Sequence, residues 1–214
     1  MPEQSVIEPK QLRSQQTQRK LLDALHTCLE DKFFEHISIK ELAEQAGVSV
    51  GTFYRRFKDK ESLLPLLYQD FGNHLDSWVT KLEKQKYRSL EQAVTKISQQ
   101  TLVFLQTNKS VFRTLHLNSR LHPQILESDK VVDRSQIYQR IASLLLDFDD
   151  EITVENKSNA AGTVVFVMIN TLLEKVLYPT LTPAIASELN ANDYAKEMPK
   201  MLLAYLLTCR WNNS

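Results

Sequence analysis

The outward face of one short predicted helix carries the side chains best suited to chemistry in this sequence. At about 100° per residue, Phe53 and Phe57 lie on one side of a helix that starts near Ser49. The opposite side carries Gly51, Thr52, Tyr54 and Arg55. Glycine permits close backbone approach, hydroxyl groups bond phosphates, and an arginine fork matches guanine O6 and N7. This face predicts a helix in the major groove of DNA, although an ordinary helical hairpin with a solvated face fits the periodicity equally.

Two short helices joined by a tight turn must position that face. Ser38 followed by Glu41 forms a capping box, which predicts the start of the first short helix. Apolar residues then recur at helical spacing, at Ile39, Leu42, Ala43 and Ala46. Gly47 ends this helix because glycine adopts positive φ without a Cβ penalty, and Ser49 can cap the next one.

Helical periodicity continues through the rest of the chain, which predicts an all-α fold. One helix precedes the short pair, from about Gln15 to Lys32, and a long one follows Asp59. The stretch Asn156 to Tyr178 is apolar around most of its circumference, so it must be buried on more than one side. We expect a flexible arm at residues 1–14, a helix-turn-helix domain at 15–58 and a helical domain at 59–214.

Composition excludes several classes of function. The 214 residues include only four glycines, and no HExxH, GxSxG, GxxxxGK[ST] or GxGxxG motif occurs, so an NTPase or a dinucleotide enzyme is not expected. The two cysteines form no CxxC pair, and His116 and His122 miss the i, i+4 spacing of a helical metal site. We therefore assign no catalytic residue, no metal and no cofactor. Basic and acidic residues cancel, so the case for DNA rests on local charge.

The segment from Ala46 to Leu63 resembles the N-terminal signature of the TetR family of transcriptional regulators. The shared pattern is Ala46-Gly47-Val48-Ser49-x-Gly51-Thr52-Phe53-Tyr54-x-x-Phe57-x-x-Lys60-Glu61-x-Leu63. With the helix geometry, the resemblance implies contact with operator DNA through Ser38, Ser49, Val50, Gly51, Thr52, Tyr54, Arg55 and Lys60. Val50 stands where the family often has lysine, which replaces a phosphate contact with an apolar one.

The resemblance also implies a homodimer that senses a small apolar or amphipathic effector. We expect dimer contacts from the Asn156–Tyr178 helix and the final helix, at Val165, Ile169, Leu172, Leu202 and Tyr205. The candidate effector residues are Phe104, Phe112, His116, Tyr138, Phe166 and Asn170. For each of these, completion of the core is the alternative. Asn170 needs a hydrogen-bond partner in its apolar helix, whether backbone, ligand or second subunit.

Together these patterns predict a cytoplasmic DNA-binding repressor that an effector releases from its operator. The longest apolar run, Val164 to Ile169, is too short to cross a bilayer, so no membrane association is expected. An activator, or a regulator that answers a protein partner, fits the same residues. A helical enzyme with an apolar pocket is the alternative from another class, and the missing catalytic constellation counts against it.

Overall fold

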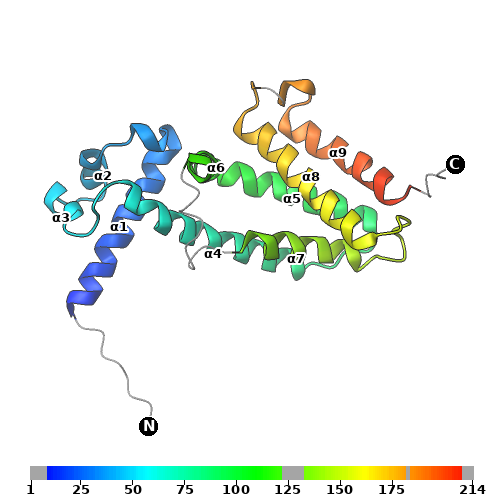
Figure 1. Cartoon of the computed structure of the whole chain (residues 1–214), viewed down its shortest axis with the longest axis horizontal. Coiled ribbons are helices and arrows are strands. Elements are labelled where there is room, and N and C mark those ends of the chain that lie inside the picture. The colour runs from blue at the N-terminus through cyan, green and yellow to red at the C-terminus, as the bar shows by residue number, and fades with distance from the viewer. Residues whose placement is uncertain (1–8, 122–132, 182–183, 209–214) are drawn as a thin grey trace, which may run out of the picture. The chain divides into compact units, whose positions relative to one another are not determined.

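The structure, a computed structural model, describes residues 9–121, 133–181 and 184–208, and all regular structure in these ranges is helical (Figure 1). The α-helices are α1 (Pro9–Asp31), α2 (Ile39–Gln45), α3 (Val50–Tyr54), α4 (Leu64–Glu83), α5 (Leu90–Thr107), α6 (Lys109–Leu121), α7 (Arg134–Leu146), α8 (Lys157–Leu177) and α9 (Ala191–Leu206). Short 3₁₀ turns are η1 (Phe34–His36), η2 (Glu61–Leu63) and η4 (Ala184–Ala186). The all-α prediction is confirmed.

The chain forms two compact units whose boundaries fall inside helices. The first, which we call the head, contains residues 9–71 and 113–121 of the described chain, and the second, the body, contains residues 72–112 and those described from 133 onward. The sequence-based boundary at residues 58 and 59 therefore differs from the structural division. Leu63, Leu64 and Leu67 are completely buried and belong to the head, so the start of α4 completes its core.

The predicted first helix and arm differ from the structure at one end. Helix α1 begins at Pro9, so residues 9–14, assigned to the arm, are helical, while residues 1–8 lie outside the described residues. The first turns of α1 carry few apolar side chains, which explains why hydrophobic periodicity did not detect them. Further along α1, the fully buried Leu21, Leu25 and Leu29 form one stripe that packs into the core of the head.

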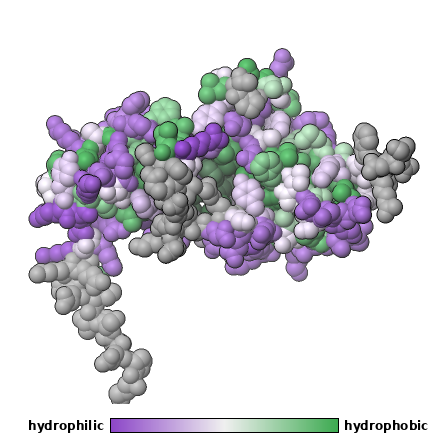
Figure 2. All heavy atoms as spheres, in the orientation of Figure 1, coloured by the Kyte–Doolittle hydropathy of each residue, from purple (hydrophilic) through white to green (hydrophobic). Residues whose placement is uncertain are grey.

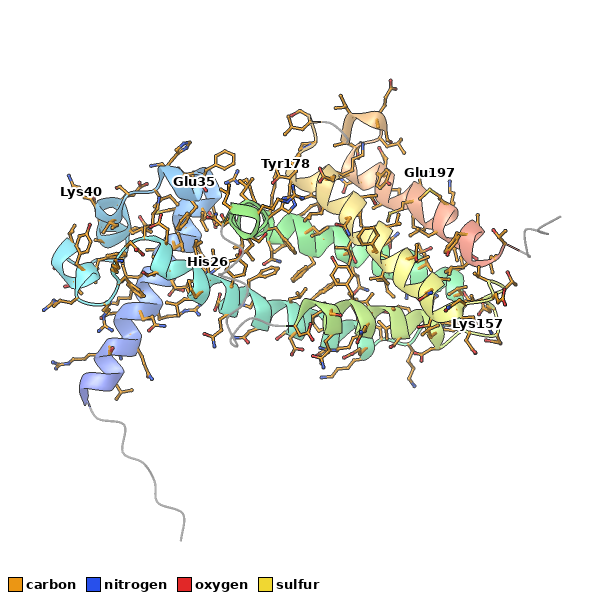
Figure 3. The ribbon with its side chains drawn as sticks, viewed as in Figure 1. His26, Glu35, Lys40, Lys157, Tyr178 and Glu197 are labelled. Carbon is orange, nitrogen blue, oxygen red and sulfur yellow. The ribbon has the colours of Figure 1, made fainter. Side chains whose placement is uncertain are left out.

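Polar contacts join the other elements of the head to α1. His26, labelled on α1 in Figure 3, places Nε2 3.1 Å from Asp70 Oδ2 on α4, while Arg19 donates to Asp70 Oδ1 at 2.9 Å. Arg113 of α6 donates through Nη2 to the carbonyl oxygens of Leu29 and Lys32 at 3.1 and 3.0 Å. These carbonyls are at the end of α1, where a helix lacks internal donors, so Arg113 caps α1.

Helix α4 starts later than its sequence suggests. Asp59 accepts a hydrogen bond from the backbone amide of Ser62 at 2.9 Å and so acts as a cap, but the residues that it caps form the 3₁₀ turn η2. The α-helix begins at Leu64, and Pro65 therefore lies in its first turn. Proline is tolerated there because an amide in the first turn has no partner in the helix.

The body buries α8 among α5, α7 and α9. Its core includes the fully buried Ala160, Val164, Val165, Met168 and Leu172 of α8. Residues 122–132, part of a stretch expected to be helical, lie outside the described residues. By length and composition alone α8 could cross a membrane, which differs from the expectation based on its longest apolar run. Core helices of soluble proteins pass the same test, and 44% of the tested window is buried within this structure.

Candidate nucleic-acid interface

Helix α3 is a helix of five residues in the head (Figure 1). Only Phe53 is buried, with no exposed surface, and its ring centroid lies 5.5 Å from that of Phe57. Val50 is 39% exposed and Tyr54 56% exposed, which is unusual for large side chains of these types. The predicted outward face is therefore present at the surface of the head.

The turn before α3 is formed as the sequence predicts. Ser38 Oγ accepts from the Glu41 amide at 3.1 Å and caps α2. Gly47 has a φ of 65°, the left-handed conformation that ends α2. The amide of Val48 then donates to the carbonyl oxygen of Ala43 at 2.9 Å and closes the turn. Ser38 therefore has a structural role, and its expected contact with DNA stays a prediction.

Three polar side chains of the α3 face form a connected series. Ser49 Oγ accepts from the Thr52 amide at 3.1 Å and lies 2.9 Å from Thr52 Oγ1. Arg55 Nη2 donates to the same Thr52 Oγ1 at 2.8 Å. The cap of α3 and its arginine are thus joined through one threonine hydroxyl. Arg55 is exposed and presents a cation beside the uncharged Val50 and Tyr54.

Gly51 is not required by the fold of the head. Its φ lies outside the left-handed region, and an added Cβ would meet only Ser49 Oγ, at 3.8 Å. That distance is an ordinary van der Waals contact. Neither backbone conformation nor internal packing therefore demands a glycine at this position.

Lys60, one of the residues expected to contact operator DNA, makes hydrogen bonds within the head, and its contact with DNA stays a prediction. Its ammonium donates to the carbonyl oxygens of Phe34 and Glu35 at 2.7 and 3.1 Å and lies 4.6 Å from the Phe34 ring centroid. Arg56 likewise donates to Ser14 of α1. The cations of this segment that point to solvent are therefore Arg55 and Lys58, both exposed.

The residues predicted to bind an effector are not all brought together. Phe104 stacks on Trp78, with ring centroids 4.6 Å apart, and meets Phe112 edge-on at 6.0 Å. Tyr138 packs partly buried against the same core of the body. The sequence did not indicate Trp78 as part of this cluster, because a single aromatic residue on an apolar stripe has the same pattern as an ordinary core residue.

Three predicted effector residues lie elsewhere. His116 belongs to the head. Phe166 is 59% exposed, and Asn170 Nδ2 donates to the Phe166 carbonyl oxygen at 2.8 Å, so the partner that Asn170 needed is its own helix. Sequence periodicity placed Phe166 on an apolar helix but did not show that this side of α8 faces solvent.

The predicted dimer residues require a correction. Val165, Leu172 and Leu202 have exposed fractions of 0–3% and belong to the core of the body, so they cannot form a surface interface. Ile169 is partly buried and Tyr205 is 42% exposed. The large apolar residues that α8 and α9 expose are Phe166, Met201 at 54% and Tyr205. Figure 2 shows hydrophobic residues between hydrophilic ones on the face of the body in view.

A groove of about 750 Å³ lies in the body near the end of α8 and the start of α9. Lys175, Ile185, Leu189 and Asn192 are among its described lining residues, which include none of the predicted effector residues. The Lys175 ammonium is already bonded to the carbonyl oxygens of Ala184, Ser187 and Leu189. Within the described ranges, no group of three or more His, Cys, Asp or Glu residues could hold a metal ion.

These features are those of a helix-turn-helix protein, and comparison with known proteins shows which family this part of the chain matches. Residues 21–73 match the family of bacterial regulatory proteins named tetR. The uncharacterized HTH-type transcriptional regulator YvkB of Bacillus subtilis is 32% identical over 74 residues, which cover 35% of this chain and 39% of YvkB. An HTH-type transcriptional regulator of Staphylococcus aureus (strain USA300) is 25% identical over 104 residues, 48% of this chain and 55% of that protein. The chain thus spans about half or less of these relatives.

Solved structures extend the likeness in fold to most of the chain. A TetR-family regulator from Mesorhizobium loti MAFF303099 has a TM-score of 0.61 at 19% identity, covering 91% of this chain and 96% of that one. Bacillus subtilis FadR, solved with stearoyl-CoA, has a TM-score of 0.59 at 15% identity, covering 87% and 98%. Residues 21–73 thus match the TetR family, and the fold of most of the chain is similar to that of a TetR-family regulator, with the helix-turn-helix in the head and a helical C-terminal domain.

Proposed function

We propose that the protein is a cytoplasmic, homodimeric transcriptional regulator that binds operator DNA through α3. The observation that carries this proposal is the exposed face of α3, where Val50, Thr52, Tyr54 and Arg55 project from a helix held by the buried Phe53. An α-helix fits the major groove, and the side chains on this face can contact both base edges and phosphates. The unneeded glycine at position 51 supports the same function because it leaves the backbone open to a nearby duplex.

The proposed dimer uses the solvent-facing sides of α8 and α9. Phe166, Met201 and Tyr205 expose large apolar side chains there, and these two helices contact each other within the body. A symmetric pairing would bring the same two helices from each subunit together as a four-helix bundle. Two heads are also what a two-fold operator with half-sites about 34–36 Å apart requires.

We further propose that the protein is a repressor and that a small apolar or amphipathic effector releases it from the operator. The aromatic cluster of Trp78, Phe104 and Phe112 in the body offers stacking surfaces for such a molecule, and all three side chains are only partly buried. The FadR structure similar in fold contains stearoyl-CoA, which shows that one protein of this fold binds a large amphipathic ligand. Activation instead of repression uses the same residues, so only an assay of transcription distinguishes the two.

The test is selection of duplexes from a random library by the purified protein, followed by sequencing. We expect one enriched motif with two-fold symmetry, and an Arg55→Ala variant that enriches it poorly. A promoter carrying the motif ahead of a reporter gene then reports repression as a fall in expression when the protein is present. Recovery of random sequences would overturn the proposal and favour the alternative of a helical enzyme.

A further inference from the structure

We propose that Thr52 is a positioning residue, whose hydroxyl holds the Arg55 guanidinium for base reading instead of contacting DNA itself. The inference rests on the proposed function and names the residue on which its specificity depends. Sequence reasoning placed Thr52 and Arg55 together on the reading face as two independent contacts. The structure joins them, with Arg55 Nη2 and Thr52 Oγ1 2.8 Å apart.

The hydrogen-bonding capacity of Thr52 is largely used within α3. A threonine hydroxyl has one donor hydrogen and two acceptor sites. One acceptor site takes the Arg55 hydrogen bond, and the contact with Ser49 Oγ at 2.9 Å uses either the donor or the second acceptor. At least two of the three positions are therefore occupied by protein groups.

Arg55 retains the groups that reading a base requires. A guanidinium has five N–H donors, and the contact with Thr52 uses one of them. Two donors suffice for the O6 and N7 atoms of guanine. The side chain of a free arginine must be ordered on binding, and a tether to the rigid start of α3 reduces that entropic cost. Thr52 lies three residues before Arg55, which places both on one side of the helix.

The backbone of Thr52 has a separate role that a variant can preserve. Its amide, not its hydroxyl, donates to Ser49 Oγ and makes the cap of α3. Thr52→Val therefore removes the tether but keeps the cap and the side-chain shape. Thr52→Ser keeps the hydroxyl and removes only a methyl group. Comparing Thr52→Val with Thr52→Ser therefore isolates the effect of the hydrogen bond to Arg55 from the effects of the helix cap and of side-chain volume.

A double-mutant cycle tests the proposal, with dissociation constants measured by fluorescence anisotropy on the selected duplex and on a random one. The proteins are the unmodified chain, Thr52→Val, Thr52→Ser, Arg55→Ala and the Thr52→Val/Arg55→Ala double variant, each checked for an unchanged thermal midpoint. We expect Thr52→Val to weaken binding of the selected duplex about tenfold, and less than about twofold when Arg55 is already alanine. Thr52→Ser should stay within about twofold of the unmodified chain.

The outcomes separate this inference from the proposed function. If the unmodified chain prefers no duplex, the proposed function fails. If it prefers one, but Thr52→Val costs the same with and without Arg55, Thr52 contacts DNA directly and the positioning role is wrong. A Thr52→Ser variant as weak as Thr52→Val also overturns it, because the methyl group and not the hydroxyl would then matter. Lys58→Ala is the control, and its effect should add to that of Thr52→Val.

Discussion

The Lys60 ammonium lies 2.7 Å from the carbonyl oxygen of Phe34 and also donates to the carbonyl oxygen of Glu35. These two carbonyls belong to η1, the turn between α1 and α2. The Phe34 ring, buried with 3% of its surface exposed, lies 4.6 Å below the same charge. A residue expected to contact operator DNA thus joins the segment after α3 to the turn before α2.

Replacing Lys60 by methionine should destabilise the head. The variant keeps the length of the side chain but removes two charged hydrogen bonds, at a cost of about 1–3 kcal/mol. Thermal or urea unfolding followed by circular dichroism measures this loss, with Lys58→Met as the matched control. A variant of unchanged stability that loses affinity for every duplex equally would instead support a phosphate contact by Lys60.

Arg55→Ala should reduce specificity more than general affinity for DNA. We expect a loss of about 1–3 kcal/mol at particular base pairs of the selected site and little change on random duplexes. Lys58→Ala should instead weaken binding on all sequences and reduce the salt slope by about one unit. Titrations at several salt concentrations measure both quantities. Equal losses on selected and random DNA for Arg55→Ala would remove its reading role.

Charge introduced at Phe166 should dissociate the dimer without unfolding the body. Phe166 is 59% exposed, so Phe166→Glu places the carboxylate in water in the monomer and in an apolar interface in the dimer. Val165→Glu is the contrasting variant, because this neighbouring residue has no exposed surface and its charge would unfold the protein. Sedimentation and circular dichroism distinguish the two. A Phe166→Glu protein that remains dimeric would place the interface elsewhere.

The body should lose stability in acid through the contact between Arg140 and Glu83. Arg140 Nε and Nη2 donate to the two Glu83 carboxylate oxygens at 2.7 and 2.8 Å. These hydrogen bonds hold the pKa of Glu83 below its ordinary value of about 4.3 to 4.5, against a smaller opposing effect of burial. The unfolded chain therefore binds the proton more readily, so this stabilisation is present above that range and is lost as pH falls through the lowered pKa.

Glu83→Gln should flatten the dependence of the thermal midpoint on pH below about pH 4.5. The amide can still accept from Arg140, so the fold is kept while the titrating charge is removed. Glu155→Gln, at an exposed carboxylate, is the control and should leave the curve of the unmodified protein in place. Identical curves for all three proteins would show that the contact between Arg140 and Glu83 does not contribute to stability in solution.

An effector bound at the aromatic cluster should change the fluorescence of Trp78. The chain has two tryptophans, so Trp211→Phe leaves Trp78, stacked on Phe104, as the only emitter. Ligands found by thermal shift are titrated into this variant with and without the selected duplex. Linkage requires DNA to weaken ligand affinity by the factor by which the ligand weakens DNA affinity, typically 5–150-fold for such coupling. A ligand that binds without altering Trp78 emission would occupy another site.

The sequence was sufficient for the local structure of the reading face. Ser38, Gly47 and Ser49 have the predicted capping and turn roles because these depend on the chemistry of one or a few neighbouring residues. The burial of Phe53 followed from helical periodicity for the same reason. Elements with strong local signals can be located without knowledge of their tertiary contacts.

Contacts between distant segments could not be predicted in this way. Periodicity showed that α8 is apolar on most sides but not which side meets its own chain, so Val165 and Phe166 were each given the wrong surroundings. Lys60 and Arg113 contact backbone carbonyls 25 to 84 positions away, and carbonyl oxygens carry no residue-specific signal.

The separation of buried and solvent-facing residues within α3 also determines which positions of this protein can change during evolution or design. Phe53 alone of its five residues contributes to the core, and the short helix depends on its caps and its neighbours for stability. The solvent-facing positions are therefore free to vary with little effect on folding. A library randomised at residues 50, 52, 54 and 55, with Phe53, Ser49 and Gly47 kept, should yield many folded proteins with altered DNA preferences.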